Sequence, residues 1–240
     1  MVAARREPAG AGAATAPTER LQGRARVTRQ ALLVAAATRF AEVGYHGTSL
    51  SEVIAASQVT KGALYFHFAS KQALADAVVA EMVARWRVMV AEVNARGLDP
   101  LWSLLAQTDE VVVRKIEDPI ARGGIQLVTD PGVVCAEAAT HYLYGEAAAK
   151  EQLTAAAEGG LLRSGVDPAQ IARVVVSMIT GSNLLCDLFR GHNYLWEAVT
   201  ELWQGLLPAI ATDPWLERWR AVDWPRRPMP VISGFSGPLH

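Results

Sequence analysis

The sequence contains little of what a disulfide-stabilised, membrane-embedded or metal-binding protein requires. Its 240 residues include two cysteines, Cys135 and Cys186, which lie far apart in apolar contexts. Two such cysteines provide neither a disulfide framework nor a metal-ligand pattern, so we interpret them as small buried hydrophobic residues. No uninterrupted apolar run approaches the roughly 20 residues of a membrane span. We therefore expect no metal, no cofactor and no membrane partner.

Catalytic motifs are also missing from the sequence. The five histidines are scattered, and the patterns H-E-x-x-H, G-x-S-x-G and the phosphate-binding P-loop do not occur. Enzymes that use these chemistries need a nucleophile, a base or a metal at a defined spacing. The sequence therefore favours a binding protein over an enzyme.

Charge is unevenly distributed along the chain, although the net charge is only -1. Residues 1–71 carry a net charge of +5, whereas the remainder carries -6. A basic segment joined to an acidic body is typical of a protein that meets a polyanion at one end. Residues 1–24 are rich in Ala, Gly and Pro and lack the apolar segment of a secretory signal. They predict a disordered basic arm on a cytoplasmic protein.

Helical periodicity dominates from Thr28 onward, and no alternating pattern of useful length predicts a strand. Ser49 opens a capping box of the form S-x-x-E, and Asp99 and Asp167 each stand before a proline, which is a second helix-start signal. Gly44 is a residue type that commonly ends helices. The fold class is therefore all-α. Helices are expected over 28–44, 50–58, 61–68, 71–96, 100–116, 119–130, 133–162, 168–190 and 194–211.

Two short helices joined by a tight turn follow the first long helix, within the basic part of the chain. This order is the plan of a helix-turn-helix module, whose second short helix enters the major groove of DNA. The stretch VTKGALYFHF, residues 59–68, has Lys61 and Gly62 near its start and the aromatic residues Tyr65, Phe66 and Phe68 within the next two helical turns. So short a helix cannot bury all of these rings, and its N-terminus attracts phosphate. The stretch predicts a DNA-facing surface.

Residues 28–74 closely resemble the N-terminal domain of the TetR family of bacterial repressors. The family pattern is a helix ending in G-Y/F, then T-S/T, a V-x-K/R-G-x-L-Y-x-H-F core, and K-x-x-L. The chain further resembles the subgroup of γ-butyrolactone receptors of actinomycetes, through Phe66 in the core and the segment 118–130. The family pattern is matched by Gly44, Tyr45, Thr48, Ser49, Val59, Lys61, Gly62, Leu64, Tyr65, His67, Phe68, Lys71 and Leu74.

The resemblance implies a TetR-like architecture. A three-helix helix-turn-helix DNA-binding domain is expected over 25–71, a helical ligand-binding and dimerisation domain over 72–212, and a tail over 213–240. Ser49 and Lys71 are expected on backbone phosphates, and His67 has a competing role in packing against the next helix. Arginines of the arm are candidate minor-groove or phosphate contacts. The expected DNA-binding residues are Arg26, Thr48, Ser49, Thr60, Lys61, Gly62, Ala63, Tyr65, Phe66, His67 and Lys71.

A few polar side chains on an apolar helix face separate a ligand pocket from a core. γ-Butyrolactone receptors commonly have a tryptophan in the segment that corresponds to residues 139–153, where this sequence has only tyrosines as large rings. The ligand is therefore expected to be a γ-butyrolactone or a more polar molecule, such as a furan, a butenolide or an antibiotic intermediate. The candidate ligand-binding residues are Trp86, Met89, Trp102, Leu105, Gln126, Tyr142, Tyr144, Thr180 and Asn183.

The resemblance also implies a homodimer that represses antibiotic or other secondary-metabolite genes from a near-palindromic, double-stranded operator. The helices over 168–190 and 194–211 are expected to pair with their symmetry mates, and three tail tryptophans are expected to dock partly on the body. Two alternatives stay open. One is a multidrug or antibiotic-sensing regulator of an efflux or biosynthetic gene, and the other is a pseudo-receptor without ligand control. The sequence does not separate them, because a cavity is the difference between two packings.

Overall fold

The structure, a computed structural model, describes residues 15–130, 132–133, 138–186 and 193–228. Within these residues every regular element is helical, and a single antiparallel bridge joins Leu162 to Ala211. This confirms the all-α prediction. The helices are α1 (Thr15–Gly47), α2 (Leu50–Ser57), α3 (Lys61–His67), α4 (Lys71–Asn94), α5 (Pro100–Glu117), α6 (Pro119–Thr129), α7 (Ala138–Glu158), α8 (Pro168–Leu185), α9 (Asn193–Ile210), α10 (Asp213–Ala221) and the 3-10 turn η2 (Trp224–Arg226).

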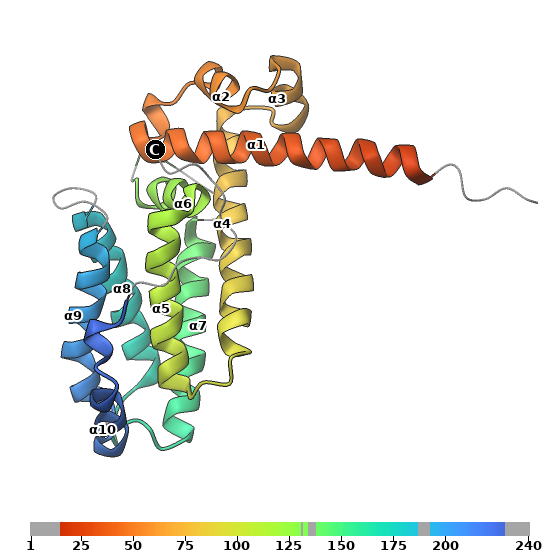
Figure 1. Cartoon of the computed structure of the whole chain (residues 1–240). Helices are drawn as coiled ribbons and strands as arrows, with labels where there is room; N and C mark the ends of the chain where they lie inside the picture. Colours follow the sequence, from red (N-terminus) through yellow and green to blue (C-terminus); the bar gives the residue numbers. More distant parts are fainter. Residues whose placement is uncertain (1–14, 131, 134–137, 187–192, 229–240) are drawn as a thin grey trace, which may run out of the picture.

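Helix α1 lies across one end of the molecule, with α2 and α3 against its outer side (Figure 1). Helix α4 leads from this end into a body built from α5, α7, α8 and α9, and α10 lies at the opposite end (Figure 1). The N-terminal part of α1 extends beyond the body. The prediction of a disordered arm is therefore wrong for residues 15–24, which are helical. Good helix formers make up six of these ten residues, and Pro17 lies in the first turn of α1, where proline is tolerated, so that only Gly23 opposes the helix interior.

Caps position the short helices, as the sequence predicted. The Ser49 Oγ accepts a hydrogen bond from the backbone N–H of Glu52 at 3.2 Å, and the Ser49 N–H donates to Glu52 Oε2 at 2.8 Å. Asp99 caps α5 and Asp167 caps α8 in the same way. Gly44 has a φ of 72°, a left-handed conformation that glycine adopts without steric cost, and it kinks α1 before α2 begins.

Two hydrophobic clusters hold the molecule together. The first joins α1, α2 and α3 to α4 and α6, around Phe40, Leu64 and Leu74. The second joins α5 and α7 to α8, α9 and α10, around Leu153 and Trp203. The first cluster therefore includes residues beyond 71, where the DNA-binding domain was expected to end, because α4 and α6 supply much of its apolar surface. The cavity described below lies between the two clusters.

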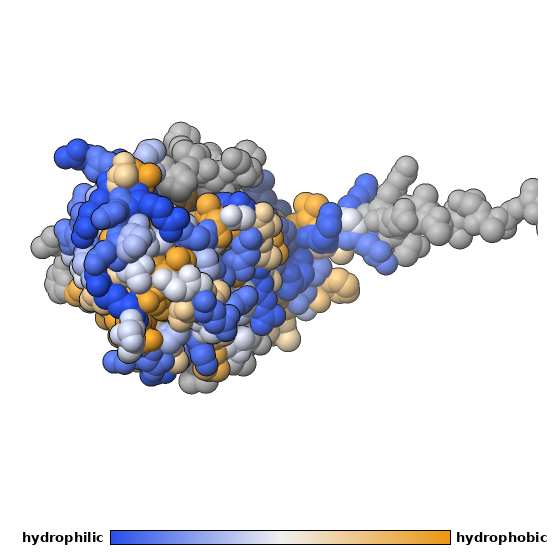
Figure 2. Space-filling view, turned by 90° about the horizontal axis from the view of Figure 1, so that it is seen from below, coloured by the Kyte–Doolittle hydropathy of each residue, from blue (hydrophilic) through white to orange (hydrophobic). Residues whose placement is uncertain are grey.

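The C-terminal segment packs on the body. Trp215, Trp219 and Trp224 are buried in the second cluster, so the partial docking expected for the tail holds over 213–228. With these rings buried, the end of the body seen in Figure 2 is mostly hydrophilic, with small apolar areas. Cys186 is buried, as predicted, whereas Cys135 lies outside the described residues. Of the helices described, none is both long enough and apolar enough to cross a membrane.

Candidate nucleic-acid interface and ligand cavity

Helix α3 divides its side chains between the core and a free surface. Leu64 is fully buried and Phe68 is 4% exposed, and both belong to the first hydrophobic cluster. Phe66 is 81% exposed and Tyr65 48% exposed, and Lys61 is also exposed. A phenylalanine ring that remains in water, on a helix whose first residue is an exposed lysine, is typical of an interaction surface.

The N-terminus of α3 is open to an approaching anion. Thr60 caps the helix by accepting a hydrogen bond from the N–H of Ala63 at 3.2 Å. Gly62 is exposed, and a Cβ added there would meet no atom within 4 Å. Free backbone N–H groups, a positive helix end and a cationic side chain together favour phosphate. His67 is half-buried, with its ring 5.0 Å from that of Phe66 in an edge arrangement, so it also supports the exposed ring.

The two expected contacts before α2 differ in their exposure. Ser49 is exposed beside the start of α2, where its side chain caps the helix. Thr48 is only 2% exposed, and its Oγ1 donates to the carbonyl oxygen of Gly44 at 2.8 Å. The prediction of a direct DNA contact by the Thr48 side chain does not fit this burial. Its hydroxyl closes the turn between α1 and α2 instead.

Lys71 joins the end of α1 to the start of α4. Its Nζ donates to the carbonyl oxygens of Tyr45 at 2.8 Å and Thr48 at 2.9 Å, and lies 4.4 Å from the centre of the Tyr45 ring. The ammonium group therefore holds the turn that places α2 and α3. One of its three N–H donors is left over, and a phosphate contact by that donor stays a prediction.

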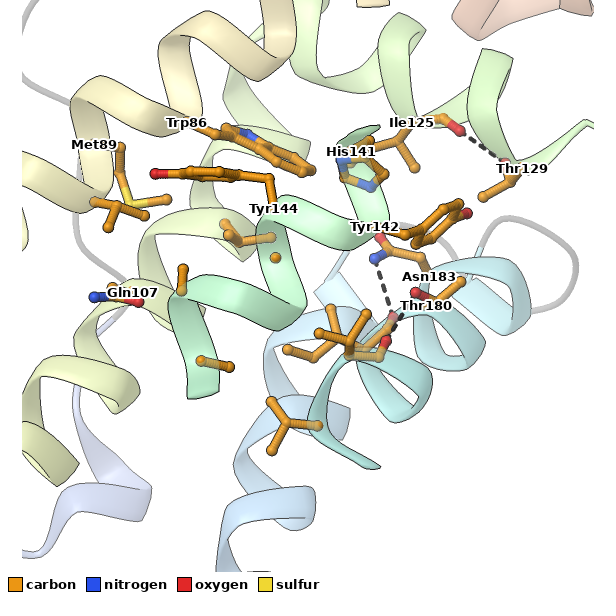
Figure 3. A pocket seen from close by; sticks show the side chains of 18 residues that line it. Trp86, Met89, Gln107, Ile125, Thr129, His141, Tyr142, Tyr144, Thr180 and Asn183 are labelled. Atoms are coloured by element: carbon orange, nitrogen blue, oxygen red, sulfur yellow. Dashed lines mark hydrogen bonds between the residues drawn. The ribbon is translucent and has the colours of Figure 1, made fainter. Parts of the chain in front are cut away.

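A cavity of about 110 Å³, measured as the space open to the centres of water molecules, lies among α4, α5, α6, α7 and α8 (Figure 3). Its wall is mainly apolar, with polar side chains concentrated on α7 and α8. Such a wall is typical of a site for a small organic ligand. The lining residues are Trp86, Met89, Val90, Gln107, Val111, Ile125, Thr129, His141, Tyr142, Tyr144, Gly145, Ala148, Ala149, Val175, Val176, Ile179, Thr180 and Asn183.

Most of the expected ligand residues line this cavity, namely Trp86, Met89, Tyr142, Tyr144, Thr180 and Asn183. Trp102 and Leu105 do not, because they face the second hydrophobic cluster, where the Trp102 ring lies 5.4 Å from that of Trp215. Gln126 does not line the cavity either. The cavity face of α6 is formed by its neighbour Ile125 and by Thr129, which is four residues further along the helix. These three predictions were wrong about the helix face.

His141 is the main cavity residue that sequence reasoning missed. Its ring lies 4.4 Å from that of Trp86 and 4.7 Å from that of Tyr142. The signal was present, because His141, Tyr144, Gly145 and Ala148 follow the i, i+3, i+4, i+7 spacing of one helix face. Burial lowers the pKa of His141 to about 4, so the imidazole is neutral at physiological pH. Burial likewise raises the pKa values of the Tyr142 and Tyr144 hydroxyls.

The low pKa of His141 predicts a stability that falls in acid. Below about pH 6.5 the unfolded chain binds a proton at this residue, whereas the folded chain does so only near its folded pKa of about 4. The free energy of unfolding should therefore decrease as the pH drops from 6.5 to 4, by up to about 3 kcal/mol. Urea unfolding at several pH values tests this. His141→Phe should flatten the decrease, whereas replacing the exposed His46 with glutamine should not.

The helix that connects the cavity to the DNA-facing end is α6. Ile125 and Thr129 line the cavity, while Gly123 lies directly against α1, where a Cβ would come within 2.3 Å of the carbonyl oxygen of Ala37. Arg85 of α4 donates to Asp118 Oδ2 at 2.8 Å, and the same carboxylate caps α6. Gly123 therefore places the α6 backbone in direct contact with the α1 backbone.

Comparisons with known proteins agree with this geometry. Residues 32–78 match the model of the bacterial regulatory proteins of the tetR family. The chain is 33% identical over 190 residues to the A-factor receptor protein of Streptomyces griseus, a match that spans 79% of this chain and 66% of that receptor. The LmrA regulator of Bacillus subtilis and the UidR regulator of Escherichia coli are matched over less than half of their length.

Solved structures show the same architecture. A γ-butyrolactone receptor described as an ArpA-like protein superposes with a TM-score of 0.72 at 28% identity, over 84% of this chain and 96% of that one. A structure that addresses the molecular basis for control of antibiotic production by bacterial hormones superposes with a TM-score of 0.70 at 32% identity, over 77% and 98% of the two chains. The helix-turn-helix end, the helical body and these similarities together show that the chain belongs to the TetR family of bacterial regulatory proteins.

Proposed function

We propose that this protein is a ligand-responsive transcriptional repressor. It binds a near-palindromic operator as a homodimer and is released by a small signalling molecule of the γ-butyrolactone, butenolide or furan type. The genes that it controls are those of antibiotic or other secondary metabolism. Similarity to the A-factor receptor protein and to a γ-butyrolactone receptor supports this assignment.

The observation that carries the proposal is the position of the cavity relative to the DNA-facing helix. The DNA-facing helix α3 does not line the cavity, which is formed by α4, α5, α6, α7 and α8. Helix α6 borders both the cavity and α1. A ligand can change DNA affinity only if it favours one of two arrangements of the protein. The contact of α6 with α1 provides a direct route by which cavity occupancy alters the placement of α3.

An apolar face on α8 supports dimerisation. Met178, Leu184 and Leu185 are 43%, 50% and 48% exposed in the single chain, and they lie on one helix. Met178 and Leu185 are seven residues apart and therefore lie on the same side of the helix, and exposed apolar side chains placed in this way favour burial against a partner. A two-fold dimer would present two α3 helices to one face of the duplex, spaced by about 34–36 Å, one turn of B-DNA. Ligand binding would then favour a spacing that does not fit the operator.

The test is fluorescence anisotropy with DNA from upstream of the protein's own gene, with and without an organic extract of the source culture. Tight binding that the extract releases supports the proposal. Tight binding that no extract affects favours a pseudo-receptor. Release by structurally unrelated drugs, but not by the extract, favours a multidrug regulator. No binding at moderate salt contradicts repression from this site.

Lys61 provides a sharper test of the DNA-facing surface. Lys61→Ala should weaken binding to specific and unrelated DNA alike, because a lysine at the start of α3 meets phosphate and not a base. The slope of log affinity against log salt should fall by about one unit. The matched control is Lys150→Ala, which removes an exposed lysine from α7. An unchanged slope in the Lys61 variant would remove this residue from the interface.

A further inference from the structure

Three polar side chains at one end of the cavity donate hydrogen bonds to the backbone of their own helices. Thr129 Oγ1 donates to the carbonyl oxygen of Ile125 at 2.8 Å, and Thr180 Oγ1 donates to that of Val176 at 2.8 Å. Asn183 Nδ2 donates to the carbonyl oxygen of Ile179 at 3.0 Å (Figure 3). These bonds use the hydroxyl donors of Thr129 and Thr180 and one of the two amide N–H donors of Asn183, and the three side-chain oxygens keep lone pairs that can accept a hydrogen bond from a bound molecule.

One of these acceptors is buried and has no partner. Asn183 is 5% exposed, and its Oδ1 makes no hydrogen bond in the structure. Its orientation is set, because the amide nitrogen is held by the α8 backbone. A buried acceptor without a donor is rare in folded proteins and commonly marks a place where a ligand or water binds.

A second unpaired atom lies near the same end. His141 Nδ1 on α7 is buried without a hydrogen-bond partner, and Figure 3 shows the His141 ring on the same side of the cavity as Asn183 and Tyr142. A hydroxyl group donates one hydrogen bond and accepts others. One or two hydroxyl groups on a single ligand have the donors and acceptors needed to pair with Asn183 Oδ1 and His141 Nδ1.

The wall also selects against charge. None of the described residues that line the cavity is Asp, Glu, Lys or Arg. Arg87 lies 5.5 Å from the centre of the Tyr144 ring but is itself exposed and does not line the cavity. The pKa of His141, lowered by burial to about 4, keeps that ring uncharged. An ammonium or carboxylate group would enter this space without a counter-ion, which is costly in an apolar environment.

We propose that Asn183 Oδ1 is the acceptor for a hydroxyl group of an uncharged ligand, with His141 Nδ1 as the second polar contact and the apolar part of the ligand against Ala148, Ala149 and Val175. This proposal rests on the proposed function, because it specifies the ligand class of the same cavity. The proposal predicts that the cavity binds an alcohol more tightly than the acid or the amine with the same carbon skeleton.

The experiment uses four synthetic γ-butyrolactones that share one acyl chain and differ in one substituent: hydroxymethyl, methoxymethyl, carboxyl and aminomethyl. Calorimetric titration of the full-length protein should show the hydroxymethyl compound binding at least about tenfold more tightly than the other three. The ether lacks the donor for the buried acceptor, and the carboxylate and the ammonium group would be buried without a counter-ion. In Asn183→Leu this preference over the methoxymethyl compound should disappear. In Asn183→Asp the aminomethyl compound should gain affinity, because a carboxylate then faces its ammonium group.

Ser177→Ala, an exposed polar residue of the same helix, is the matched control and should keep the wild-type preference. Equal binding of the alcohol and its ether, tightest binding of the carboxylate, or a preference that survives Asn183→Leu would each overturn the proposal. Failure of all four compounds to bind a protein that still binds its operator would also overturn it. Operator binding by the same preparations is measured in parallel, so that a failure of the repressor function is recognised separately.

Discussion

Replacing Arg227 with alanine is expected to lower the free energy of unfolding by about 3–5 kcal/mol, the usual result of leaving one buried charge without its partner. Arg227 lies beyond α10, and its Nε donates to Asp109 Oδ2 of α5 at 2.6 Å, while its Nη2 bonds the other carboxylate oxygen. Its Nη1 donates to Thr200 Oγ1 of α9 at 3.1 Å. The guanidinium also lies over the rings of Trp196 and Trp224.

Burial makes this carboxylate dependent on its partner. The side chains of Asp109 and Arg227 are 12% and 13% exposed, and burial raises the pKa of Asp109 even though Arg227 opposes the rise. Arg227→Ala therefore leaves the buried carboxylate of Asp109 without its ion-pair partner. The melting temperature should fall by roughly 6–20 °C for a chain of this size.

The matched control is Arg226→Ala, because the Arg226 side chain is 85% exposed and should contribute less than about 0.5 kcal/mol. Replacing the pair together, as Asp109→Leu with Arg227→Met, should recover most of the lost stability, since apolar residues of similar size commonly replace a buried ion pair without cost. Equal melting temperatures for the Arg226 and Arg227 variants would contradict a stabilising role of the Arg227–Asp109 ion pair.

Gly123→Val is expected to reduce both stability and operator affinity. A Cβ at Gly123 would lie 2.3 Å from the oxygen, 2.6 Å from the Cα and 2.8 Å from the carbonyl carbon of Ala37, and these backbone atoms cannot rotate away. The two helices must separate. Overpacking of this kind typically costs about 1–3 kcal/mol, and valine also lowers the helix propensity relative to most residues.

The effect on DNA follows from the same contact. Because α1 carries α2 and α3, a displaced α1 should lower operator affinity even where the protein remains folded, as measured by anisotropy well below its melting temperature. Gly205→Ala is the control, since that helical glycine of α9 has no atom within 4 Å of an added Cβ and should be neutral or stabilising. A stable Gly123→Val variant with wild-type operator affinity would show that the α6–α1 contact does not position the DNA-facing helices.

The candidate sites could be predicted from the sequence to different extents. The surface of α3 depends on local signals, because Thr60 caps the helix that follows it and a two-turn helix cannot bury Tyr65 and Phe66 as well as Leu64. The cavity depends on which helix faces meet. Trp102 and Leu105 have the apolar character of pocket residues, but the second hydrophobic cluster and the distant Trp215 cover their face of α5.

The sequence alone determined the class of fold, the starts of most helices and the DNA-facing stretch, because helical period, caps and the family pattern are properties of neighbouring residues. Only the tertiary structure decided that Thr48 is buried and that Arg227 reaches Asp109 across 118 positions. It also decided that Asn183 Oδ1 and His141 Nδ1 lack partners in one cavity. Each of these features depends on contacts between segments far apart in the chain, which no local pattern specifies.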